Sequence, residues 1–192
     1  MYKTPSQRYK VVNGKETIQI RVNSPLQLFD SRDPAPFRDR DLDDDFTDYL
    51  ISCADEVPNR APLHIEIIIA KPQPDIKSEA IIEAIENYFQ YQIELKKTQF
   101  SKMLRMARLF LIVGMVVLAF CLGLSQLTKH IPNEIFSTTF REGIVIFGWV
   151  SMWKPLELLL FDWYPIYDRI QLLKRILTAE IQVQLESAPN NS

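Results

Sequence analysis

The sequence predicts an α+β membrane protein in which a small mixed α/β domain is joined by a long stalk helix to a two-helix transmembrane hairpin. Two observations carry this prediction. Residues 109–128 form an apolar stretch without formal charge, and residues 1–76 alternate between strand-like and helix-like patterns. Twenty helical residues rise about 30 Å, which matches the hydrocarbon core of a bilayer.

Composition and charge set the limits of the organisation. The chain has 192 residues and a formal net charge of -2, long enough for one small soluble domain and a membrane hairpin. Residues 1–10 contain no apolar core, so we expect no secretory signal and an N-terminal half that stays in the compartment of synthesis. Cys53 and Cys121 fall in different phases, which suits a reducing cytosol.

Residues 1–76 are predicted to form a cytoplasmic α/β domain. Residues 17–22 alternate in polarity as a half-buried strand does, and the Ile-rich residues 63–70 form a second strand. Residues 9–12 are a weaker strand candidate, joined to the first by an Asn-Gly turn. A helix is expected over residues 42–56, capped by Asp41 or Asp39. Three strands with helices on one face are the simplest packing.

Proline-containing residues 23–40 form a long loop, in which Phe29 and Phe37 are expected to act as anchors on the sheet.

A stalk helix is expected over residues 77–108, because apolar residues recur every three or four positions there. No Pro or Gly interrupts the pattern before Gly114, so the stalk should continue into the first transmembrane helix, residues 109–128. A short external loop, residues 129–134, follows.

The second transmembrane helix is predicted over residues 135–166, although Lys154, Pro155 and Glu157 break its hydrophobic run. Basic residues precede the first span and follow the second, whereas the connecting loop carries few. The positive-inside rule then places both termini in the cytoplasm, with the two spans in the cell (inner) membrane.

The C-terminal part is expected to be a cytoplasmic amphipathic helix over residues 167–186, followed by a disordered tail, residues 187–192. Its apolar stripe, which includes Ile170, Leu173 and Ile181, has helical spacing. This helix would lie against residues 81–100 as an antiparallel stalk.

The best candidate for a functional site is one face of the second span. Glu142, Trp149, Trp153 and Glu157 share a face of an ideal helix, and charges within a membrane normally face a protein interior or water. One interpretation is a pore lined by this face, which would need several copies of the chain. The other is structural: Lys154 and Glu157 form an intramembrane ion pair, and the tryptophans anchor the helix.

Two charged clusters lie outside the predicted spans. The basic residues before the first span could contact lipid headgroups and also set the topology: Lys96, Lys97, Lys102, Arg105 and Arg108. The acidic cluster in residues 39–45 either binds Ca²⁺ or Mg²⁺ or is a solvated helix start, and its spacing does not match an EF-hand. We expect no metal site and no cofactor. We also expect no nucleic-acid partner, because the soluble domain is acidic.

Part of the second predicted span resembles the second span of the mitochondrial calcium uniporter family, which also has two spans. The residues that carry the resemblance are Trp149, Trp153 and the segment Lys154-Pro155-Leu156-Glu157. Here Pro precedes Glu and the family's Trp-Asp pair is missing. The resemblance therefore implies no ion selectivity for any residue of this chain.

No catalytic signature is present in the sequence. His64 and His130 are far apart, and we find no phosphate-binding glycine loop, metal-spaced cysteine pair or nucleophile elbow. The first hypothesis is therefore a non-enzymatic membrane protein that forms homo-oligomers and presents a cytoplasmic scaffold or sensor domain to a protein partner. The alternative is an oligomeric ion channel whose pore is lined by the second transmembrane helix.

Overall fold

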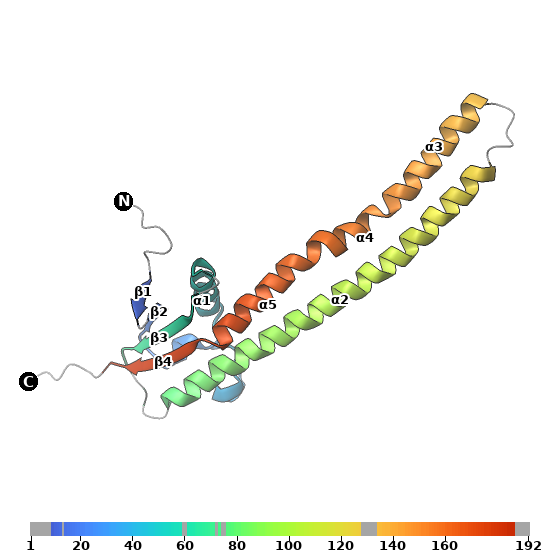
Figure 1. Ribbon diagram of the computed structural model, residues 1–192. Coiled ribbons are helices and arrows are strands. Elements are labelled where there is room, and N and C mark those ends of the chain that lie inside the picture. The colour runs from blue at the N-terminus through green and yellow to red at the C-terminus, as the bar shows by residue number, and fades with distance from the viewer. Residues whose placement is uncertain are drawn as a thin grey trace, which may run out of the picture. The chain divides into compact units, whose positions relative to one another are not determined.

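The structure, a computed structural model, describes residues 9–12, 14–58, 61–71, 73, 76–127 and 134–186 (Figure 1). The chain divides into two compact units. We call Met1–Leu95 with Arg169–Ser192 the head, and Lys96–Asp168 the hairpin unit. The head therefore combines residues from before and after the hairpin unit.

The head contains a four-stranded sheet in the order β1-β2-β3-β4. Strand β1 (Lys10–Val12) pairs antiparallel with β2 (Lys15–Val22), which pairs parallel with β3 (Leu63–Ile69). Strand β4 (Glu180–Leu185) pairs parallel with the other edge of β3. Gly14 precedes β2 with φ of 77°, a backbone conformation that glycine adopts at no steric cost.

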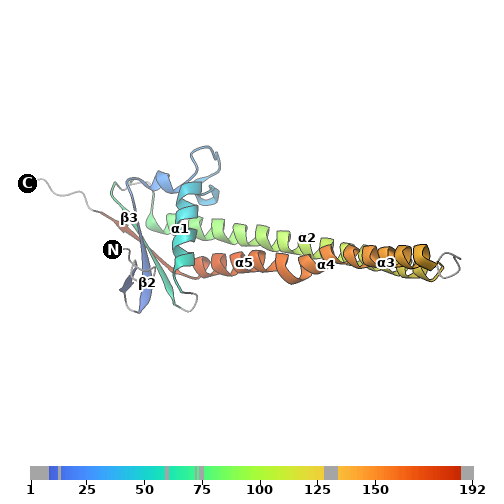
Figure 2. The same ribbon diagram turned by 90° about the horizontal axis from the view of Figure 1, so that it is seen from above.

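Alternation gives the sheet one apolar and one polar face. Ile18 and Ile20 of β2 and Ile65, Ile67 and Ile69 of β3 are buried on the apolar face. Helix α1 (Asp44–Glu56) and the head segments of α2 (Ser78–Leu127) and α5 (Trp163–Leu177) lie on one side of the sheet (Figure 2). They add the following buried residues to the core: Phe46, Leu50, Cys53, Ile81, Ile85, Phe89, Ile170, Leu173 and Ile176.

The loop between β2 and α1 is ordered. It contains two 3₁₀ turns, Pro25–Leu28 and Phe37–Asp39, and a β-bridge between Phe29 and Leu42 closes its second part. Phe29 is buried and its ring lies 4.4 Å from that of Phe37. The Asp30 amide also donates to the Asp41 carbonyl at 2.9 Å.

The stalk and the first predicted span form one uninterrupted helix, α2, as the sequence predicts. Its 50 residues correspond to a rise of about 75 Å. The second predicted span contains α3 (Glu134–Ser151), α4 (Trp153–Glu157), a π-helical turn (Leu158–Asp162) and the start of α5. Within the hairpin unit, α2 lies antiparallel to α3 and α4 (Figures 1 and 2).

Two helical stretches, Ser78–Leu127 and Thr138–Leu177, are long and apolar enough to span a membrane, judged by length and composition. Only 17% and 11% of their most apolar windows are buried.

The structure corrects three predictions. Residues 180–185 form β4 and not the end of an amphipathic helix over 167–186, so the sheet has four strands and not three. Helix α5 ends at Leu177, where the Thr178 hydroxyl donates to the carbonyl of Lys174. The cap of α1 is Asp43, and neither Asp39 nor Asp41. Residues 129–133 of the predicted external loop, and 187–192 of the predicted tail, lie outside the described residues.

Candidate functional site

The second membrane-type helix is interrupted near Pro155. Helix α3 ends at Ser151, α4 begins at Trp153, and the π-helical turn follows at Leu158. Proline has no N–H, and its ring clashes with the carbonyl four residues earlier, so Pro155 removes the helical partner of the Ser151 carbonyl. Regular bonding resumes at once, because the Leu156 amide donates to the Met152 carbonyl at 3.2 Å.

At the interruption, α2 approaches closely through Gly114. A Cβ atom placed on Gly114 would be 3.0 Å from the Ser151 carbonyl oxygen, 3.0 Å from Met152 Sδ and 3.6 Å from Pro155 Cγ. The Ser151 hydroxyl donates to the Gly148 carbonyl at 2.6 Å, and the Gly114 carbonyl oxygen lies 3.4 Å from the same hydroxyl. A side chain at position 114 would therefore be tighter than usual against the carbonyl that Pro155 frees, and glycine avoids this contact.

A second close approach of the two helices lies at Gly148 of α3. A Cβ on Gly148 would be 3.0 Å from Cys121 Cβ and 3.0 Å from Leu118 Cδ1. Small residues that let two backbones approach are typical of helix pairs in membranes. On the other side of Pro155, Leu158 packs on Met103 and Ala107.

A polar cluster sits beside the break. Lys154 Nζ donates to Glu157 Oε2 at 2.9 Å, and it lies 3.9 Å from Asp162 Oδ2. Lys154 and Asp162 are eight residues apart, more than two α-helical turns, and the extra residue of the π-helical turn brings them onto one side. Since Pro155 lies opposite Gly114 and Leu158 opposite Ala107, the cluster stands at the start of the apolar stretch and not at its centre.

The predicted functional face of the second span points away from α2. Trp149 and Trp153 are 64% and 72% exposed, and Glu142 is exposed as well. Glu157 is half-exposed and lies with Lys154. The structure thus brings the predicted ion pair together, and the face formed by Glu142, Trp149, Trp153 and Glu157 is not an interior surface of a single hairpin.

The predicted headgroup-contact residues line the start of the hairpin unit on α2. Lys97, Lys102, Arg105 and Arg108 are exposed. Lys96 is half-exposed and donates to Gln99 Oε1 at 3.4 Å. Among the described residues, none of these five cations forms an ion pair, so their charge is available to a surface of opposite sign.

An apolar groove of about 660 Å³ lies beside the hairpin helices, at the end remote from Pro155. It is lined almost entirely by apolar atoms, from Val117, Phe120, Cys121 and Leu124 of α2 and from Phe140, Ile144 and Phe147 of α3. Gly143 also lines it and would meet nothing within 4 Å if it carried a Cβ. The two helices therefore pack closely at Gly114 and Gly148 and leave this groove farther out.

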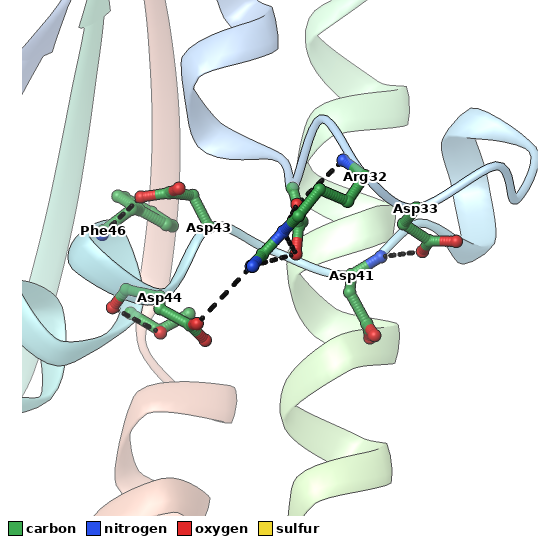
Figure 3. A network of polar contacts seen from close by, with 8 residues as sticks. Arg32, Asp33, Asp41, Asp43, Asp44 and Phe46 are labelled. Atoms are coloured by element: carbon green, nitrogen blue, oxygen red, sulfur yellow. Dashed lines mark hydrogen bonds and ion pairs between the residues drawn. The ribbon is translucent and has the colours of Figure 1, made fainter.

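The acidic segment before α1 organises the loop (Figure 3). Asp43 accepts from the Phe46 amide at 3.2 Å, and Asp33 accepts from the amides of Ala35 and Asp41 at 2.9 and 2.7 Å. Asp30 accepts from the Arg32 side chain at 2.7 Å. In the part of the chain that the structure describes, no group of three His, Cys, Asp or Glu side chains is placed to hold a metal ion.

The same contacts shift the acidity of the loop. The hydrogen bonds from the Arg32 guanidinium and backbone lower the pKa of Asp30 to about 2. The two backbone donors of Asp33 also lower the pKa of that carboxyl. Both aspartates therefore act as loop acceptors in their ionised form.

Arg175 has a structural role that the sequence does not predict. From the sequence it is only one of the basic residues that follow the second predicted span. Its Nη1 donates to the carbonyls of Ala54 and Val57 at 3.2 and 2.8 Å, and its Nη2 to those of Pro58 and Ala61 at 2.7 and 3.1 Å. These carbonyls belong to the end of α1 and the segment that follows, where helical partners run out. Arg175 thus ties α5 to the end of α1 within the head.

Comparison of the chain with protein-family models, with curated proteins and with solved structures gave no match.

Proposed function

We propose that this chain is an integral membrane protein that crosses the bilayer twice, associates with copies of itself and presents its head as a cytoplasmic interaction domain. It is proposed to act as a scaffold or sensor and not as an enzyme. The apolar surface of the hairpin unit supports a bilayer as its environment. Exposing side chains such as Phe110, Val116 and Phe120 to water would be costly over so long a stretch.

The observation that carries the two-span arrangement is the pairing of β4 with β3. Strand β3 precedes both apolar stretches and β4 follows them, so a folded head requires both flanks on one side of the membrane. An even number of crossings meets this condition. The short connection between α2 and α3, residues 128–133, is compatible with two antiparallel spans.

The basic residues support a cytoplasmic head. Lys97, Lys102, Arg105 and Arg108 are exposed just before the apolar stretch, where the positive-inside rule places cations on the cytoplasmic side. The same side chains are suited to contact anionic lipid headgroups of the inner leaflet. We therefore propose the cell (inner) membrane as the location.

The head supports the interaction role through the polar face of its sheet. On the sheet side opposite the helices, Glu66 accepts hydrogen bonds from Gln19 and Gln184, so three neighbouring strands present one ordered polar row. An ordered polar surface of this kind is suited to bind a protein partner reversibly.

Cysteine labelling tests the topology. In a variant with Cys53 and Cys121 replaced by Ser, a new cysteine replaces Asp48 in the head, Lys174 after the second span, or Lys129 between the spans. A membrane-impermeant maleimide should label positions 48 and 174 only in inside-out vesicles and position 129 only in right-side-out vesicles. Labelling of positions 48 and 174 from opposite sides would exclude the proposal.

Native mass spectrometry of the protein in detergent tests self-association. We expect a defined species with more than one copy. A monomer at every protein concentration measured would exclude the scaffold role.

The alternative, an oligomeric ion channel, is favoured by one observation: Glu142, Trp149 and Trp153 are exposed on the side of the hairpin that faces away from α2. In a ring of several copies this side would line the pathway. Glu157→Gln should then change ion flux in reconstituted vesicles. Flux equal to that of empty vesicles for the unmodified chain would eliminate the channel.

A further inference from the structure

We propose that strand β4 is a dimerisation edge, at which it pairs antiparallel with β4 of a second copy. The inference rests on the proposed self-association and names its surface. Strand β4 is the last strand of the sheet, bonded to β3 on one side only. The proposal follows from which backbone groups face outward, from the lack of protection at this edge and from the symmetry of its sequence.

The register shows which groups of β4 are free. Leu185 lies opposite Ile69, and the Glu186 amide donates to the Ile69 carbonyl at 2.9 Å. Successive residues of a strand direct their backbone N–H and C=O groups to opposite edges. The backbone groups of the even-numbered residues of β4 therefore point toward β3. The N–H and C=O groups of Ile181, Val183 and Leu185 point outward. Within the described ranges none of these six groups has a hydrogen-bond partner.

This edge lacks the features that usually block strand addition. Exposed edges are commonly protected by proline, by lysine, by a bulge or by a very short strand. Strand β4 reads EIQVQL, has six residues in regular register with β3, and contains neither proline nor a basic residue. Leu185 is also 46% exposed, although it lies on the apolar side of the sheet. A second strand beside β4 would bond its backbone and cover this side chain.

The strand matches itself when two copies run antiparallel about Val183. Val183 then faces Val183 of the second copy, and Ile181 faces its Leu185. Each of these pairs joins residues whose backbone groups point outward, so the six free groups of each copy find six partners. The apolar side chains of both copies fall on the same face, and Gln182 pairs with Gln184 on the polar face.

The charges at the ends of the strand are compatible with this pairing. Glu180 would lie opposite Glu186 of the second copy, and two like charges there would be unfavourable if bare. In each copy, however, Glu180 is 2.6 Å from Lys15 Nζ and Glu186 is 2.6 Å from Arg21 Nη2. Each end of the paired strands would therefore hold two cations and two carboxylates.

Disulfide trapping of the full chain in its membrane tests the register. With Cys53 and Cys121 replaced by Ser, Val183→Cys places two thiols on residues that would face one another at about 5.5 Å between Cα atoms, within the range of a disulfide. We expect mild oxidation to convert most Val183→Cys chains into covalent dimers. Val11→Cys, exposed on the opposite edge strand β1, is the control and should stay monomeric.

A second variant tests the backbone bonds. Val183→Pro removes an outward N–H and leaves the bonds from β4 to β3 in place, so the dimer should be lost while the head stays folded. Absence of Val183→Cys dimers from a chain that native mass spectrometry finds to be oligomeric would overturn the β4 interface and leave self-association intact. A monomeric chain would overturn both the β4 interface and the proposed self-association. A disulfide between Val183→Cys of one copy and Val11→Cys of another would overturn the symmetric dimer, because the sheets would then join head to tail through opposite edges.

Discussion

Gly114 of α2 lies directly against the Ser151 carbonyl, the group that loses its helical hydrogen bond to Pro155. The glycine and the proline therefore work as a pair on two antiparallel helices. One creates an irregular backbone segment, and the other lets the neighbouring helix approach it. An irregular segment within an apolar helix is tolerated where it is packed against protein.

Gly114→Ala should destabilise the hairpin unit by about 1–3 kcal/mol, because the new Cβ meets a backbone oxygen that cannot turn away. Reversible unfolding in mixed detergent, followed by circular dichroism, measures the change. Gly123→Ala is the matched control on the same helix, since nothing lies within 4 Å of its added Cβ. Equal stability of the two variants would show that the close approach is absent in the protein.

Arg175→Met should cost the head on the order of 2–3 kcal/mol, because four carbonyls around the end of α1 lose a charged donor. The free energy of unfolding of the full chain in detergent measures the loss. Lys174→Met, at an exposed neighbouring position, should be close to neutral. Arg175→Lys should recover little, because an ammonium cannot reproduce the planar fork of donors.

Asp43→Ala should destabilise α1 by about 1 kcal/mol, the usual effect of losing an N-cap acceptor. Asp41→Ala removes a side chain that does not cap the helix and should have the smaller effect on α1. Amide hydrogen exchange at Phe46 reports on the cap directly, because that amide is the donor. Unchanged exchange at Phe46 in Asp43→Ala would contradict the assignment.

The head should lose stability in acid through Asp30. A carboxyl whose pKa is lower in the folded than in the unfolded state stabilises the fold above its unfolded pKa, near 4, and ceases to do so as the pH falls through the folded value of about 2. Acid unfolding between pH 4 and pH 2, as roughly bounded by these values, should therefore be weaker in Asp30→Asn. An acid transition of Asp30→Asn equal to that of the unmodified chain would contradict this role of Asp30.

Sequence periodicity predicted the long helices well, because their physics is local. The uncharged residues after Arg108 and the uninterrupted stripe before them require one continuous helix, and α2 has that form. Strands β2 and β3 were equally visible from alternation and from the Ile run. What stayed hidden was decided by contacts between distant parts of the chain.

Strand β4 is the clearest case. Ile181 and Leu185 are four residues apart and extend the helical stripe of α5, so the helix pattern fits them. Val183 fits only the alternation of a strand, and the choice is made by β3, which supplies the hydrogen bonds. The place of Arg175 had the same origin, since the carbonyls that it binds lie more than a hundred positions earlier in the chain. No local sequence pattern predicts the π-helical turn that brings Asp162 close to Lys154.

The position of β4 also governs how the protein is made. Strand β3 leaves the ribosome about 110 residues before β4, an interval of roughly 5–20 s at usual rates of synthesis. During this time the edge of β3 that binds β4 is unpaired in the nascent head. Both apolar helices are synthesised before the last strand is available. The sheet can therefore be completed only after both apolar helices have been synthesised, so the fold of the head depends on a strand that is made after the whole hairpin unit.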